Sequence, residues 1–146
     1  MRVTVHRSPS LAPADLAAIR EGGLAPLLRR SGDALGVPAR AGLALRLTGD
    51  AELRRLNRLH AGVDAATDVL AFPGESREWV GDVAISVERA RAQSPDAACG
   101  ELRLLAVHGL LHCLGHDHDE AGRAALMTAE TRRLLPGQDV PDLVSH

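Results

Sequence analysis

Residues 102–118 read Leu-Arg-Leu-Leu-Ala-Val-His-Gly-Leu-Leu-His-Cys-Leu-Gly-His-Asp-His. From Leu102 to Leu114 this stretch is apolar or small on nearly every side, so we predict a buried helix around which the fold is built. His108 and His112 are four residues apart and therefore project from the same face of that helix. Because burying an imidazole without a partner costs free energy, both histidines need one.

The residues that follow offer a third imidazole. Gly115 lies where a left-handed turn can end a helix without a Cβ clash. We therefore expect the chain to turn back and bring His118 against the same two rings. Three imidazoles that leave a fourth tetrahedral position for water are typical of a catalytic zinc site, so we predict one Zn²⁺ per chain, held by His108, His112 and His118. Nickel or copper would compete for the same ligands. The alternative is that these are core histidines bonded to nearby backbone.

The histidine spacing also matches a metalloprotease signature, H-E-x-x-H-x-x-G-x-x-H, at every position except the glutamate. Gly109 stands where a peptidase carries its general base, which disfavours a peptidase. No other general base follows from spacing, so the catalytic residues stay unassigned. We expect Asp117 to orient an imidazole or to accept backbone N–H groups in a turn. His116 is expected to face solvent, with proton transfer or a spare ligand as alternatives.

The composition is that of one globular domain. The chain has 146 residues, 45% of them hydrophobic and 25% charged, which predicts a single domain over residues 1–135 followed by a C-terminal tail over residues 136–146. Two cysteines make no disulfide framework, and the N-terminus looks like neither a signal peptide nor a membrane span, so we expect a cytoplasmic protein with no membrane partner. Cys113 points away from His112 and is expected to be a buried apolar residue.

Hydrophobic periodicity divides the chain into short elements. Strands are predicted at residues 2–7, 43–48, 69–72 and 80–87. Helices are predicted at residues 13–34 with a break at Gly22-Gly23, from Asp50 as N-cap to Gly62, from Ser86 as N-cap to Gln93, and at 101–114 and 119–135.

These elements predict an α+β fold: a mixed sheet of about four strands packed against helices, with the metal-binding helix buried. The first strand, helix and strand imply a parallel pair. Pro73 is expected to end the third strand, and the strands around a polar loop at residues 73–79 are expected to pair antiparallel.

A polyanion would have to meet a local basic patch, because the formal net charge is −2. Arg54 and Arg58 share a helix face and Arg55 flanks it, so these three are candidate RNA-binding residues; a solvated helix face is the alternative. Phe72 and Trp79 are the only aromatic residues apart from histidine. Single-strand binding on stacked aromatic platforms is therefore excluded.

Three blocks of sequence together carry a family pattern between residue 52 and about residue 120. They are His108-Gly109-x-Leu111-His112-x-x-Gly115-x-Asp117-His118, then Leu56-Asn57 with Asp64 and Thr67-Asp68-Val69-Leu70-x-Phe72-Pro73, and Gly81-Asp82-Val83-x-Ile85-Ser86. In these blocks the chain resembles the YbeY family of bacterial rRNA-maturation endoribonucleases. The family's tyrosine-arginine pair is replaced by His60-Ala61, and its tyrosine before the last aspartate-histidine pair by His116.

The resemblance implies a zinc-dependent endoribonuclease that cuts single-stranded RNA and acts in small-subunit (16S) rRNA maturation and ribosome quality control. It places the zinc ligands at His108, His112 and His118. The implied partners are rRNA, the small ribosomal subunit and ribosome-assembly proteins, with no DNA.

Two other functions stay open at this point. One is a non-catalytic ribosome-assembly factor with a structural metal, which the loss of the family's arginine at Ala61 favours. The other is a metallohydrolase that acts on amides or esters, which the missing glutamate at Gly109 disfavours.

Overall fold

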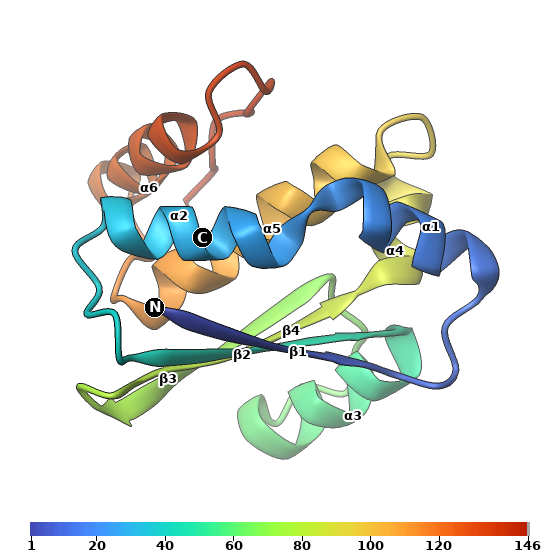
Figure 1. Cartoon of the computed structure of the whole chain (residues 1–146). Coiled ribbons are helices and arrows are strands. Elements are labelled where there is room, and N and C mark those ends of the chain that lie inside the picture. The colour runs from blue at the N-terminus through green and yellow to red at the C-terminus, as the bar shows by residue number, and fades with distance from the viewer. Residues whose placement is uncertain (146) are drawn as a thin grey trace.

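The structure is a computed structural model that describes residues 1–145. Within these residues, one four-stranded sheet has the order β1-β2-β4-β3 (Figure 1). The strands are β1 (Arg2–Arg7), β2 (Gly42–Thr48), β3 (Val69–Ser76) and β4 (Trp79–Ser86). β1, β2 and β4 run parallel, and β3 pairs antiparallel with β4. The predicted mixed sheet is confirmed, including the parallel first pair and the antiparallel last pair.

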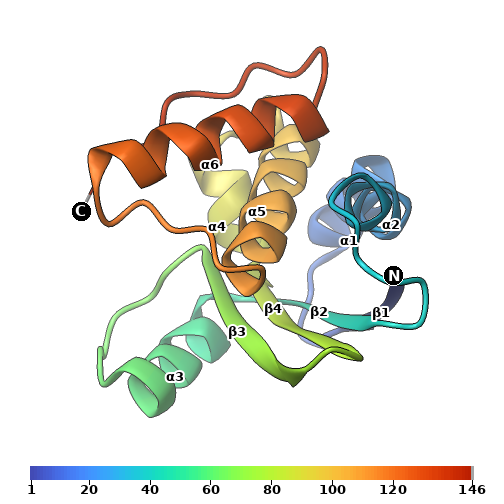
Figure 2. The ribbon, with the colours of Figure 1, turned by 90° about the vertical axis from the view of Figure 1, so that its left-hand side faces the viewer.

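Helices cover the two faces of the sheet unequally. The described helices are α1 (Pro13–Gly22), α2 (Leu24–Ala34), α3 (Asp50–Ala61), α4 (Val87–Gln93), α5 (Ala98–Cys113) and α6 (Ala121–Leu134). Figures 1 and 2 show α3 alone below the sheet and the other helices above it, with α6 lying outside α5. None of the helices in residues 1–145 combines the length and the apolar character needed to cross a lipid bilayer.

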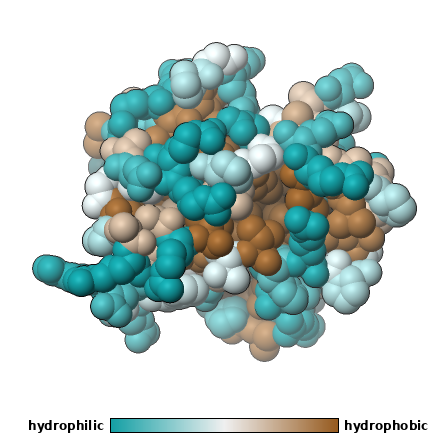
Figure 3. Space-filling view, viewed as in Figure 1, coloured by the Kyte–Doolittle hydropathy of each residue, from teal (hydrophilic) through white to brown (hydrophobic). Residues whose placement is uncertain are grey.

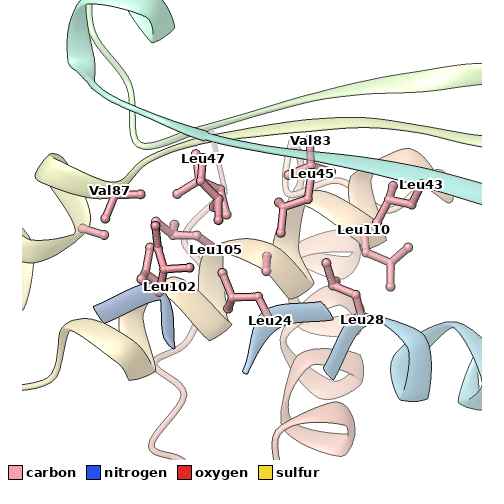
Figure 4. Close-up of a cluster of buried hydrophobic side chains, with 14 of the residues drawn as sticks. Leu24, Leu28, Leu43, Leu45, Leu47, Val83, Val87, Leu102, Leu105 and Leu110 are labelled. Atoms are coloured by element: carbon pink, nitrogen blue, oxygen red, sulfur yellow. The ribbon is translucent and has the colours of Figure 1, made fainter. Parts of the chain in front are cut away.

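The central helix α5 is buried, as predicted. Leu102, Val107, Leu110 and Leu111 have no exposed surface. One side of α5 shares a core with the sheet, α1 and α2 (Figure 4), and the other side packs against α6. In Figure 3, hydrophilic side chains cover the outer side of the α1–α2 layer, and apolar groups fill the seam between this layer and the sheet.

Gly109 sets how closely α5 approaches the sheet. A Cβ built on this residue would lie 2.4 Å from Cγ1 of Val83 in β4, far inside van der Waals contact. The helix backbone therefore rests directly on the strand at this point. A side chain at position 109 would be directed into the sheet and not toward solvent.

Two helix caps were predicted, and one of them is wrong. Ser86 caps α4, because its Oγ accepts the backbone N–H of Arg89. Asp50 is instead the first helical residue of α3, after the N-cap Gly49. Its carboxylate accepts the hydroxyl of Ser86 at 2.7 Å and two N–H groups of Arg89 at 3.0 Å each. These contacts tie the start of α3 to the start of α4.

The break in the first predicted helix is confirmed. Gly23 separates α1 from α2 and has a positive φ of 57°. Elsewhere α5 begins three residues earlier than predicted, and α6 begins two residues later.

The expectation that Pro73 ends the third strand is wrong. β3 continues through Pro73 to Ser76, and residues 73–79 form the end of a hairpin in place of a loop. β3 is an edge strand, and the backbone N–H of Ser86 donates to the carbonyl of Asp68, so residues 68, 70 and 72 direct their backbone groups toward β4. The missing N–H of Pro73 falls on the open edge and costs no ladder hydrogen bond.

The segment after α6 packs back on the domain, although its sequence has no periodicity. Val140 is 5% exposed and joins the core between α5 and α6. Gln138 donates to the carbonyl of Gly100 at 2.7 Å, and the N–H of Leu143 donates to Oγ1 of Thr128 at 3.0 Å. The last residue of the predicted tail, His146, lies outside the described residues.

Candidate metal centre

The end of α5 has the hydrogen-bond pattern of a Schellman motif. The N–H of Gly115 donates to the carbonyl of His112, and the N–H of His116 donates to that of Leu111, each at 3.0 Å. Gly115 has a φ of 98°, and a Cβ on it would meet nothing within 4 Å. Glycine is therefore needed for its backbone angle and not for lack of space. This turn reverses the chain toward α5, as the sequence predicted.

The reversal brings three metal-ligating side chains together. One donor atom from each of His112, Asp117 and His118 lies within 4.8 Å of the other two. The imidazole rings of His112 and His118 are edge to face, with centroids 5.5 Å apart and an interplanar angle of 64°. Oδ1 of Asp117 accepts the backbone N–H of His118 at 2.7 Å, which is the turn-stabilising contact expected of this aspartate.

His108 lies one helical turn before His112 and is not part of that compact group. Its Nε2 is buried and has no hydrogen-bond partner within residues 1–145. Burial, together with the nearby His112 and His118, lowers the pKa of His108 to about 4. All three imidazoles therefore influence one another electrostatically, and a backbone hydrogen bond does not account for the buried Nε2.

Two groups beside His118 have shifted pKa values that favour a neutral His112 imidazole and a charged Asp117 carboxylate. Burial lowers the pKa of His112, an effect that the negative charge of Asp117 partly opposes. The backbone N–H of His118 holds the pKa of Asp117 below its ordinary value. A metal ion binds the neutral form of histidine, so these pKa shifts keep two of the rings ready to bind near neutral pH.

These residues fit a divalent metal ion. The orphaned Nε2 of His108 needs an electron-pair acceptor, and the adjacent group supplies two more imidazoles and a carboxylate. Imidazole nitrogen with carboxylate oxygen is a donor set that suits zinc among the common metals. Cys113 adds nothing to this set, because burial raises the pKa of its thiol to about 12. Its side chain packs against the main core but is only partly buried, where a buried residue was predicted.

A cleft of about 560 Å³ opens beside the compact group. One wall is the open edge of β3 with the residues before it, and the other is the loop after α5 with one side chain of α6. The lining residues are Thr67, Asp68, Val69, Leu70, Ala71, Pro73, His112, Gly115, His116, Asp117, His118 and Arg123. The candidate metal ligands are therefore accessible to a ligand that lies along the strand edge.

The three predicted RNA-binding arginines do not line this cleft. They belong to α3, on the opposite face of the sheet (Figure 2). Arg54 is engaged by Asp64 through two hydrogen bonds of 2.7 and 3.1 Å. Arg55 lines a separate hollow near the start of α3, and Arg58 contributes to lowering the pKa of Asp64.

Sequence reasoning missed Arg123, which does line the cleft. It lies in α6, in a region whose charged residues are typical of a solvated helix face. The only sequence signal was its position, five residues after His118.

Comparison with known proteins gives one consistent family. The family model described as Endoribonuclease YbeY matches residues 21–137. Curated relatives with the same name include a protein of Moorella thermoacetica, 39% identical over 76% of this chain and 81% of its own length. Another, from Chloroflexus aggregans, is 43% identical over 72% of this chain and 78% of its own length.

A solved structure has the same fold. The solution structure of a Thermotoga maritima protein superposes with a TM-score of 0.57 and covers 91% of this chain and 86% of that one. At 20% sequence identity this likeness concerns the fold alone.

Proposed function

The chain belongs to the YbeY family of endoribonucleases, and on that premise we propose that it is a zinc-dependent enzyme that cuts single-stranded segments of small-subunit (16S) rRNA precursors. We assign it to ribosome maturation and quality control in the cytoplasm, with the small ribosomal subunit as its partner. The observation that carries the proposal is the cleft in which donor atoms of His112, Asp117 and His118 lie within 4.8 Å of one another.

In this proposal His108, His112 and His118 hold the zinc ion. When bound, zinc polarises a phosphodiester oxygen and lowers the pKa of a coordinated water toward neutrality. The low pKa of His108 keeps its imidazole neutral, which is the form that binds metal, at neutral pH. Asp117 fixes the turn that presents His118, through its hydrogen bond with the backbone of that residue.

The open edge of β3 suits an extended single strand. The Asp68–Ser86 hydrogen bond sets the phase of the ladder, so the backbone groups of Val69 and Ala71 face away from β4 and toward the cleft. Such N–H groups bind phosphate or ribose oxygens without reading base identity. This supports binding of single-stranded RNA without a preference for a particular base sequence.

The packing of Gly109 argues against an amide or ester hydrolase of the peptidase kind. The peptidase base would have to stand at this position, where a side chain is directed into Val83 and away from the cleft. The residues that line the cleft include the carboxylates of Asp68 and Asp117 but no glutamate.

The test compares His112→Ala with His6→Ala, which changes an exposed histidine on β1. We expect His112→Ala to lose most of its zinc, measured per chain by mass spectrometry, and to cut a fluorescent single-stranded RNA about 100-fold more slowly or worse. His6→Ala should match the unmodified protein. Full zinc content together with full cleavage in His112→Ala would refute the assignment.

The same preparation separates the non-catalytic alternative. Cleavage of a 16S precursor fragment by zinc-loaded protein, mapped to the nucleotide, supports the enzyme. An unmodified protein that keeps its zinc and binds pre-ribosomes, but cuts no RNA, would instead be an assembly factor with a structural metal.

A further inference from the structure

Arg123 supplies the only permanent positive charge among the residues that line the metal cleft. Its side chain extends from the first turns of α6 toward the loop that carries Asp117 and His118, and it is 43% exposed. The charge of Arg123 contributes to lowering the pKa of Asp117, so the two groups lie within electrostatic reach. No arginine of α3 supplies a positive charge to this cleft.

Two contacts orient the guanidinium without using all of its donors. One terminal nitrogen donates to Oδ2 of Asp119 at 2.9 Å, and the other donates to the carbonyl of Gly115 at 3.3 Å. A guanidinium has five N–H donors. Within residues 1–145 these two contacts leave the Nε–H and one hydrogen on each terminal nitrogen for a ligand. The fork is thus held in place and still able to bind.

The charge of the cleft shows why such a group is needed. Asp68 and Asp117 place two carboxylates on its walls against the single guanidinium, so the lining residues by themselves carry a net negative charge. Arg89 is within electrostatic reach of Asp68 but does not line the cleft. A divalent metal ion offsets this negative charge at the histidines only. A strand that extends beyond the metal needs a second cation, and a planar guanidinium matches the oxygens of a phosphate through paired hydrogen bonds.

We propose that Arg123 binds a phosphate of the RNA that neighbours the phosphodiester being cut, on the same strand. We further propose that Asp119 weakens this contact by competing for the same guanidinium. The assignment rests on the proposed function, because it takes RNA as the ligand of the cleft. It makes Arg123 a substrate-binding residue and Asp119 a modulator of substrate affinity.

The proposal predicts opposite effects for the two partners of one ion pair. Arg123→Ala should raise KM for a fluorescent single-stranded RNA about tenfold and leave kcat within about twofold, since one charge-assisted contact is lost. The logarithmic dependence of kcat/KM on salt should become shallower by about 0.7, the value for one phosphate contact on a single strand. Asp119→Asn should lower KM about threefold, because the guanidinium is released to the RNA. Arg123→Lys should recover the salt dependence but only part of the affinity.

Arg133→Ala is the matched control. Arg133 lies on the same helix, is also half-exposed, and pairs with Glu130 at 2.8 Å, but it does not line the cleft. We expect it to leave KM, kcat and the salt dependence unchanged. Zinc per chain is measured for every variant.

The outcomes separate this inference from the one it rests on. If zinc-loaded unmodified protein cuts no single-stranded RNA, both fail. If that protein cuts RNA and Arg123→Ala keeps its KM and salt dependence, only the assignment of Arg123 fails. If Arg123→Ala and Asp119→Asn both raise KM, or both lose zinc, the pair only stabilises the loop and the proposal is overturned.

Discussion

The imidazole rings of His112 and His118 meet edge to face at 5.5 Å between centroids, although a helix ends between them. Their contact depends on the reversal at Gly115, whose φ of 98° few residues other than glycine adopt. The candidate metal site therefore depends on one backbone angle as well as on its side chains.

Gly115→Ala tests that dependence. A residue with a Cβ costs about 1–2 kcal/mol in a left-handed conformation, so we expect a comparable loss of unfolding free energy in urea. Zinc affinity, measured against a competing chelator, should fall about tenfold, because the turn that presents His118 is strained. Gly137→Ala is the control, since Gly137 has a φ of 81° and also has open space around its Cα. It should lose similar stability and keep its zinc affinity; unchanged zinc affinity in Gly115→Ala would contradict the argument.

Gly109→Ala should destabilise the protein by about 1–3 kcal/mol, because the new methyl group overlaps Val83. The matched change is Gly122→Ala in α6, where the nearest atom to a new Cβ is 4.0 Å away. That variant should be up to about 1 kcal/mol more stable, since alanine is the better helix former. Adding Val83→Ala to Gly109→Ala should restore part of the loss, and urea denaturation of the single and double variants measures this coupling. Equal effects of the two glycine changes would show that α5 does not rest on Val83 at this position.

The stability of the metal-free protein should depend on pH through His108. Burial holds its pKa at about 4, compared with 6.5 for the ordinary side chain. Between these values the unfolded chain binds a proton that the folded chain does not, so unfolding free energy rises with pH across this window and levels off above it. We expect a loss of about 3 kcal/mol as the pH falls from 7 to 4, which His108→Gln should largely remove. His6→Gln, at an exposed strand position, should keep the unmodified slope; a His108→Gln protein with that same slope would disprove the cause.

Val140→Ala tests whether the C-terminal segment contributes to the fold. Val140 is 5% exposed in the core beside α6, so we expect its truncation to cost about 2 kcal/mol in thermal or urea unfolding. Val144 is 72% exposed, and Val144→Ala should have no measurable effect. Equal stability of the two variants would mean that the segment leaves the domain in solution.

The sequence predicted those parts of the fold that local patterns determine. The apolar run of α5 indicates burial on every side, and the alternation in β1 and β2 indicates strands, because both patterns reflect contacts within one element. The order of elements then limits the topology to a parallel pair followed by a hairpin.

The misses have a common physical origin in contacts between distant residues. The carboxylate of Asp50 serves Ser86 and Arg89, more than thirty residues away, in place of its own helix end. Pro73 is tolerated in β3 because its nitrogen falls on the open edge, which only the strand order reveals.

The residues of the candidate site also fall into two groups: those that local sequence patterns predict and those that only the tertiary fold reveals. Local spacing and the Gly115 turn indicated His112 and His118, which the fold brings together. Arg123 reaches the cleft only because α6 crosses the end of α5, which the pattern of α6 does not disclose. The spacing of the arginines in α3 indicated a basic patch, but α3 lies on the other face of the sheet from α5, which carries His108 and His112.

The contact between Gly109 and Val83 also limits what this scaffold can become under selection. A single codon change to glutamate there would not yield a protease, because the new carboxylate would enter the hydrophobic interior before it reached a peptide. A general base at position 109 would therefore require α5 to shift away from β4 as well as a change of residue.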